Sequence, residues 1–159
     1  MTEPRALESL NNYFDDLAVG DRFRSSARTI TEADIVAFSG FSGDRHPLHT
    51  DETFAAQGPF GARVAQGALT LSVASGLEFL LMGPGEAKVL AFYGMDRVRF
   101  VKPVFIGDTI RIEGEISELV EKDETRGVVT MREEIKNERD ETVVVLDKRT
   151  LNLKRPAGS

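Results

Sequence analysis

The hydrophobic positions of this chain have a helical period in one long segment and a strand-like period in most of the C-terminal half. Residues 65–82 are apolar around most of the helical circumference, a pattern typical of a helix buried on nearly all sides. After residue 88, apolar and polar positions alternate, most clearly over 128–135. The strands predicted from this pattern cover 88–100, 104–120, 126–137 and 141–153. A buried helix followed by a run of antiparallel strands predicts an α+β fold, in which a curved sheet wraps around a central helix.

The N-terminal part of the chain has shorter patterns. Residues 22–30 are predicted to form a first strand. Thr31 and Asp34 have the spacing of a capping box, so a helix is predicted from there to about Ser39. We expect this helix to bury Ile35.

The next segment is rich in turn residues. Residues 40–50 contain many Gly, Ser, Asp and Pro residues, which predicts a loop. Pro47 disfavours helical geometry at the residue before it. Asp51 and Glu52 suit the first turn of a short helix, predicted over 51–56.

Composition restricts the chemistry and the compartment. The chain has no cysteine, which excludes disulfides, thiolate metal sites and cysteine nucleophiles. Lys and Arg number 20 and Asp and Glu 26, so the net charge of −6 argues against nucleic-acid binding. The first ten residues have no signal-peptide pattern, and 65–82 contains Gln66, Thr70 and Glu78, which are too polar for a membrane span. We therefore expect a cytoplasmic protein with a single domain over 1–159 and no nucleic-acid or membrane partner.

The only two histidines, His46 and His49, lie in the predicted loop. Asp44 and His49 are five residues apart, the wrong spacing for one helix face, but a loop stiffened by Pro47 can fold back so that both side chains converge on one small molecule such as water. Three interpretations remain open. Asp44 caps a turn and the histidines are polar loop residues; Asp44, His46, His49 and Asp51 bind a metal ion; or Asp44 and His49 perform acid–base chemistry on a substrate.

Residues 43–49, Gly-Asp-Arg-His-Pro-Leu-His, resemble the signature Gly-Asp-x-Asn-Pro-apolar-His of the MaoC-like, (R)-specific enoyl-CoA hydratase family. Residues 60–67 resemble that family's approach to its central helix, and residues 99–108 resemble its strand and turn after the helix. The resemblance covers about residues 19–153 in the same order. It implies a hot-dog fold, and such a sheet often pairs with a second copy, so a homodimer or a dimer-based oligomer is expected.

The resemblance also implies an activity and a set of residues. Asp44 and His49 match the catalytic pair, which holds and deprotonates a water molecule. Gly67 matches a glycine whose N–H faces the thioester oxygen, and Ser72 matches a serine that supports the aspartate in some members. Each of these two positions also has a purely structural interpretation: Gly67 as a packing glycine at a close contact with the sheet, and Ser72 as a small residue that eases helix packing. The implied reaction adds water reversibly across the double bond of a 2-enoyl-CoA or acyl-carrier-protein thioester to give a 3-hydroxyacyl thioester. It needs no metal and no cofactor, since coenzyme A is part of the substrate.

Two positions depart from the family pattern. His46 stands where the family usually has Asn, and Gln66 where it usually has His; both side chains keep the ability to hydrogen-bond at a substrate-binding position. Arg97 and Arg99, with Lys102, are candidates for binding the phosphates of the coenzyme. Alternation with apolar neighbours also fits a solvated strand face for the two arginines.

Two other functions are compatible with the sequence. A hot-dog thioesterase would attack the carbonyl carbon, often with a carboxylate on the central helix, where Glu78 is the only candidate. A non-catalytic acyl-CoA-binding subunit would suit the departures from the family pattern, while the presence of both Asp44 and His49 argues against it.

Overall fold

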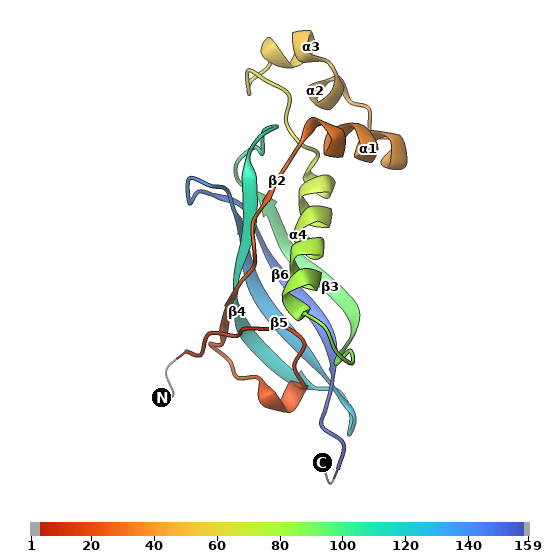
Figure 1. Ribbon diagram of the computed structural model, residues 1–159, viewed down its shortest axis with the longest axis vertical. Coiled ribbons are helices and arrows are strands. Elements are labelled where there is room, and N and C mark those ends of the chain that lie inside the picture. Colours follow the sequence, from red (N-terminus) through yellow and green to blue (C-terminus); the bar gives the residue numbers. More distant parts are fainter. Residues whose placement is uncertain (1–3, 158–159) are drawn as a thin grey trace.

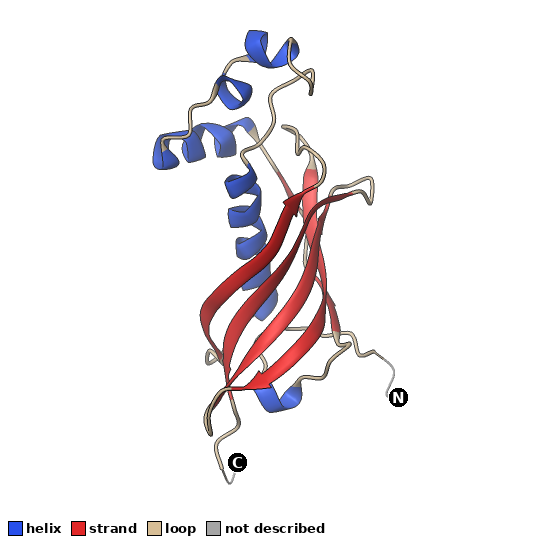
Figure 2. Ribbon diagram, turned by 180° about the vertical axis from the view of Figure 1, so that it is seen from behind, coloured by secondary structure: helices blue, strands red, loops and turns tan. Residues whose placement is uncertain are grey.

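The computed structural model describes residues 4–157, and its main feature is a six-stranded antiparallel sheet that curves around one long helix (Figure 1, Figure 2). The strands are β1 (Arg22–Arg24), β2 (Arg28–Thr29), β3 (Val89–Phe100), β4 (Thr109–Glu121), β5 (Arg126–Lys136) and β6 (Thr142–Leu153). Their order is β1-β4-β5-β6-β3, with β2 also paired to β4, and the long helix is α4 (Gly67–Met82). The predicted α+β arrangement of a sheet wrapped around a central helix is confirmed.

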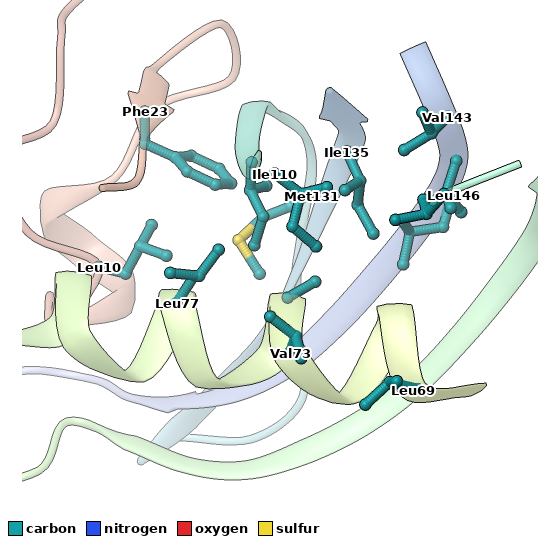
Figure 3. Packing of buried hydrophobic residues seen from close by; sticks show 14 of the residues in the cluster. Leu10, Phe23, Leu69, Val73, Leu77, Ile110, Met131, Ile135, Val143 and Leu146 are labelled. Atoms are coloured by element: carbon teal, nitrogen blue, oxygen red, sulfur yellow. The ribbon is translucent and has the colours of Figure 1, made fainter. Parts of the chain in front are cut away.

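One face of α4 packs onto the sheet and forms the core. Leu69, Val73 and Leu77 recur every four residues and are buried (Figure 3). The core residues of β4, β5 and β6 in the same cluster include Ile110, Ile112, Ile116, Met131, Ile135 and Leu146. The other sides of α4 are not covered: Phe79, on the face turned away from the core residues, is 71% exposed, and Leu80, on the flank, is 67% exposed. The prediction of a helix buried on nearly all sides is therefore wrong for the single chain, because the sheet covers only one side of it.

Two strand boundaries differ from the prediction. Residues 22–30 form two short strands, because Ser25 between them is buried and turns both its N–H and its Oγ to the backbone of Ile112, at 2.9 Å each. Residues 104–108, predicted as the start of a strand, form a turn instead. Gly107 has a φ of 97°, a left-handed conformation that glycine adopts readily and that ends regular pairing.

Three helices form a helical cap (residues 32–56) beyond one end of the sheet, at the N-terminal end of α4 (Figure 1). The helices of the cap are α1 (Glu32–Ser42), α2 (Pro47–Thr50) and α3 (Glu52–Ala56). A short 3-10 helix, η1 (Phe14–Asp16), precedes the cap in the chain. The capping box is confirmed: Thr31 Oγ1 accepts the Asp34 N–H, and Asp34 Oδ2 accepts the Thr31 N–H. Ile35 is fully buried, as expected. The helix continues past Ser39 to Ser42, and the predicted helix over 51–56 is present as α3 with Asp51 as its N-cap.

Three ionisable side chains lie in the layer between α4 and the sheet. Lys148 Nζ pairs with Glu78 Oε2, and the two side chains are 5% and 4% exposed. Glu133 is 1% exposed, and its Oε1 has no hydrogen-bond partner among the described residues. Burial and then the negative charge of Glu78 raise the pKa of Glu133 well above its ordinary value. Burial also raises the pKa of Glu78, against the opposing charge of Lys148.

Replacing Glu133 by Gln is expected to reduce the pH dependence of stability. The pKa of Glu133 in the folded chain lies above the unfolded value of about 4.3, so its contribution to folding is fully present below the unfolded pKa and is lost as the pH rises through the folded pKa. Each unit of raised pKa corresponds to about 1.4 kcal/mol. In urea denaturation from about pH 5 to about pH 9, the free energy of unfolding should fall more steeply for the wild type than for E133Q. The matched control is E134Q, whose side chain is 46% exposed. Equal slopes for the wild type and E133Q would contradict the expectation.

Candidate active site

The end of α1 places Asp44 at the start of a short connection to α2. Gly43 ends the helix with a φ of 79°, the left-handed conformation that favours glycine at this position. The Asp44 N–H donates to Ser42 Oγ at 3.1 Å, and Asp44 Oδ1 accepts the His46 N–H at 3.3 Å. The carboxylate is therefore oriented by its own loop, while its side chain remains 46% exposed.

His46 and Pro47 start α2, a four-residue helix in the segment predicted as a loop. His46 is extended (φ −55°, ψ 135°), as expected before proline, and its Nδ1 accepts the Leu48 N–H at 3.1 Å. An asparagine oxygen at an N-cap accepts the same kind of bond, so the imidazole supplies the acceptor that Asn would supply. The loop prediction for 47–50 is wrong because proline, which disfavours helix before it, is well suited to the first helical position.

The contacts of His49 determine which ring nitrogen carries the proton. His49 Nδ1 lies 2.7 Å from the carbonyl oxygen of Val64, which can only accept, so Nδ1 is the donor. In the neutral ring Nε2 is then unprotonated, and it lies 3.8 Å from Asp44 Oδ2. That separation is too long for a direct hydrogen bond and suits one water molecule donating to both atoms. The His49 side chain is 12% exposed.

His49 and Gly67 line the same pocket, which has a volume of about 430 Å³. Gly67 is the first residue of α4, where backbone N–H groups lack helical partners, and its N–H has no acceptor among the described residues. A Cβ on Gly67 would lie 2.8 Å from Cε1 of Phe100, so the glycine allows that ring to rest against the start of the helix. Lys102 is at the same pocket, with its Nζ 2.6 Å from Glu141 Oε1.

Gln66 is fully buried between α1 and α4. Its Nε2 donates to Ser39 Oγ at 2.9 Å, whereas its Oε1 has no partner among the described residues. Gln66 therefore connects the cap to the start of the central helix, directly before Gly67. Its predicted contact with substrate stays a prediction.

The other predicted site residues lie elsewhere in the single chain. Ser72 Oγ donates to the Ala68 carbonyl of its own helix at 2.8 Å, and no bond to Asp44 is found in residues 4–157. Arg97 pairs with Asp147, and it lines with Arg99 a hollow that shares no residue with the pocket of His49. The structure thus brings Asp44 close to His49, and it places His49 and Gly67 in one pocket, whose described lining does not include Asp44. Ser72 and the two arginines lie elsewhere, and their roles remain predictions.

Sequence reasoning missed two parts of this pocket. The Val64 carbonyl is a backbone group, so no residue type signals it. Phe100 lies at the end of a strand and has the same apolar signal as a core position. In the described part of the chain, no group of three or more His, Asp or Glu side chains is placed to hold a metal ion.

Comparison with known proteins identifies the family. The family model described as "MaoC like domain" matches residues 16–138. The chain belongs to this family. Among relatives of this MaoC-like protein, "3-hydroxybutyryl-CoA dehydratase" of Methylorubrum extorquens is 39% identical over 68% of this chain and 66% of its own length. "(R)-specific enoyl-CoA hydratase" of Rhodospirillum rubrum is 37% identical over 69% of this chain and 72% of its own length. "Protein MaoC" of Klebsiella aerogenes is 41% identical over 67% of this chain, which spans only 31% of that protein.

Solved structures agree on the fold. A MaoC-like dehydratase from Rhodospirillum rubrum superposes with a TM-score of 0.82 at 28% identity, covering 91% of this chain and 99% of that one. A Mycobacterium tuberculosis protein described as a double hot-dog fold superposes with a TM-score of 0.78 at 23% identity, covering 94% of this chain and 46% of that one. The hot-dog fold is therefore confirmed. Within residues 4–157, none of the helices is both long and apolar enough to cross a bilayer.

Proposed function

We propose that this MaoC-like protein is a hydratase and dehydratase that adds water reversibly across the double bond of a 2-enoyl-CoA thioester. The observation that carries the proposal is the pair of acceptors, His49 Nε2 and Asp44 Oδ2, 3.8 Å apart, with His49 lining the same pocket as Gly67, whose N–H has no acceptor among the described residues. Relatives named as 3-hydroxybutyryl-CoA dehydratase and (R)-specific enoyl-CoA hydratase support the same reaction class.

In the proposed hydration, one water molecule donates hydrogen bonds to His49 Nε2 and Asp44 Oδ2. Its oxygen attacks the β-carbon of the enoyl thioester and forms a C–O bond, while the pair takes one proton from the water. The π electrons move to the α-carbon and the thioester oxygen, which gives an enolate. The proton held by the pair then passes to the α-carbon, and the product is a 3-hydroxyacyl thioester. Dehydration takes the same steps in reverse.

The start of α4 supplies electrostatic stabilisation in this proposal. The N–H of Gly67 is aligned with the helix dipole, so it favours negative charge on an atom placed before the helix. Negative charge develops on the thioester oxygen as the enolate forms, and a donor held in advance for that oxygen lowers the barrier. The chemistry proceeds through the side chains, the water and the substrate, with coenzyme A serving as the handle.

The proposal includes a homodimer, in which two copies of the chain pair through the edge of the sheet. β3 is at the edge of the sheet, and Leu90, Phe92 and Tyr93 on it are about half exposed; Phe79 and Leu80 of α4 are exposed as well. An apolar edge strand of this kind favours pairing with a second copy. A double hot-dog relative supports the idea, since it combines two such folds.

The direct test is the loss of the conjugated enoyl-thioester absorbance when the protein is added to short, long and branched 2-enoyl-CoA substrates. We expect turnover without release of free thiol, and light scattering of the same sample should give twice the chain mass of 17.5 kDa. Free thiol would indicate a thioesterase, and binding without turnover a non-catalytic subunit. The thioesterase alternative lacks its carboxylate at the pocket, because Glu78 is buried and paired with Lys148.

A further inference from the structure

The helix that carries His49 is held in place by the segment 63–66. α2 has no buried residue, so packing alone does not anchor it. The Val64 N–H donates to the Leu48 carbonyl at 3.4 Å, and the Val64 carbonyl accepts from His49 Nδ1. Val64 in turn forms an isolated bridge with Phe105, next to the sheet. The position of Val64 therefore decides the position of the His49 ring.

Arg63, directly before Val64, ties two helices of the cap together. Its Nη1 lies 2.9 Å from Glu32 Oε1 and its Nε lies 2.8 Å from Glu52 Oε2. The Arg63 side chain is 15% exposed, although the two carboxylates are 59% and 63% exposed. A guanidinium group has donors in several fixed directions, so it can bind two carboxylates at once, which an ammonium group does less well.

Along the chain, the two carboxylates flank the segment that contains the candidate catalytic residues. Glu32 is the first residue of α1 and Glu52 the first of α3, and the chain between them contains Asp44 and His49. Arg63 lowers the pKa of Glu32, which keeps that carboxylate charged and paired. Ion pairs with exposed carboxylates add little to stability, so the main effect of Arg63 is geometric.

We propose that Arg63 is a positioning residue that holds both ends of the helical cap against Val64, and thereby keeps His49 Nδ1 on the Val64 carbonyl and Nε2 toward Asp44. The catalytic meaning of this role rests on the proposed hydratase function. The orientation and tautomer of His49, however, can be measured without turnover.

The chain has only two histidines, which makes the tautomers directly observable. His46 Nδ1 accepts a hydrogen bond, so its neutral ring carries the proton on Nε2, whereas His49 carries it on Nδ1. Nitrogen-15 spectra of the neutral imidazoles should show one ring of each kind in the wild type. In R63M we expect His49 to populate both tautomers while His46, as an internal reference, is unchanged. A pure Nδ1–H tautomer for His49 in R63M would overturn the proposal.

Kinetics of the same variants with a 2-enoyl-CoA give the second readout. R63M should lower kcat about 10- to 100-fold through misplacement of the ring, with KM changed less than about 3-fold, and R63K should recover part of the loss. R28M is the matched control, because Arg28 also pairs with a carboxylate of α1, that of Asp34, but does not bridge α1 to α3. Unchanged kcat in R63M, or an equal loss in R28M, would overturn the proposal.

The two arms of the bridge can also be removed singly. If R63M does not fold, E32Q and E52Q each remove one arm, and the double variant should mix the His49 tautomers; a double variant that keeps the wild-type tautomer would refute the role of the bridge. If the wild type hydrates no enoyl-CoA, the proposed function fails, while the tautomer spectra still decide whether Arg63 positions His49.

Discussion

Replacing Asp44 by Asn is expected to lower hydratase kcat by about 10³-fold while leaving the fold unchanged. The Asn oxygen can still accept the His46 N–H, so the loop between α1 and α2 keeps its shape. The amide has no negative charge, however. Its NH₂ group is a donor, whereas the proposed mechanism needs an acceptor at position 44 for a hydrogen bond from the water. The measurement is the rate of loss of enoyl-thioester absorbance, with circular dichroism to confirm the fold.

The matched control for Asp44 lies in the same cap. D51N removes one negative charge from the N-cap of α3, where Asn and Asp are almost equally good caps, so this variant should retain wild-type kcat. Wild-type activity in D44N would exclude Asp44 from the chemistry. Equal losses of kcat in D44N and D51N would show that the net charge of the helical cap matters, rather than the Asp44 carboxylate itself.

The same substitution made at the two histidines should have opposite results. H49N is expected to lower kcat by about 10³-fold, because Asn supplies no base at the position of Nε2. H46N is expected to keep kcat within about threefold of the wild type, because Asn is among the best N-cap residues and can accept the Leu48 N–H in place of Nδ1. Steady-state kinetics with one 2-enoyl-CoA measure both variants.

The pair of histidine variants also distinguishes the alternatives for the loop. A large loss in H46N with little loss in H49N would reverse the assignment and make His46 the base. Large losses in both would indicate that the two imidazoles act together, as in a metal site. A loss confined to H49N agrees with the observed contacts, in which the His46 ring is occupied as a helix cap.

Most of the fold can be predicted from local patterns in the chain. The four long strands and α4 were predictable because their periods extend over ten or more residues, and the capping box marked the start of α1. The division of residues 22–30 into β1 and β2 was not predictable, because the break at Ser25 depends on a side-chain contact to β4, which lies far along the chain. The exposure of Phe79 and Leu80 was also not predictable, since periodicity shows that a face is apolar but not whether anything covers it.

The candidate site was predictable only in part. Asp44 and His49 were identified by their resemblance to a family signature, and spacing alone left three interpretations open. Their separation depends on how α2 lies against Val64, where the His49 ring contacts a backbone carbonyl 15 residues away that no residue type reveals. Arg97 was a plausible phosphate ligand from its charge, whereas its partner Asp147 is 50 residues away in the sequence.

Because α2 has no buried residue, the local stability of the candidate site can differ from the global stability of the sheet and α4. Segments with few buried apolar contacts open locally at a free-energy cost far below that of global unfolding. We therefore expect α2, which bears His49, to open locally more often than the sheet and α4 unfold. Changes in the sheet core will alter how long the protein survives, whereas changes in the cap will alter what fraction of surviving molecules is ready to react. If the proposed hydratase function holds, adaptation to another temperature can proceed through the cap without rebuilding the core.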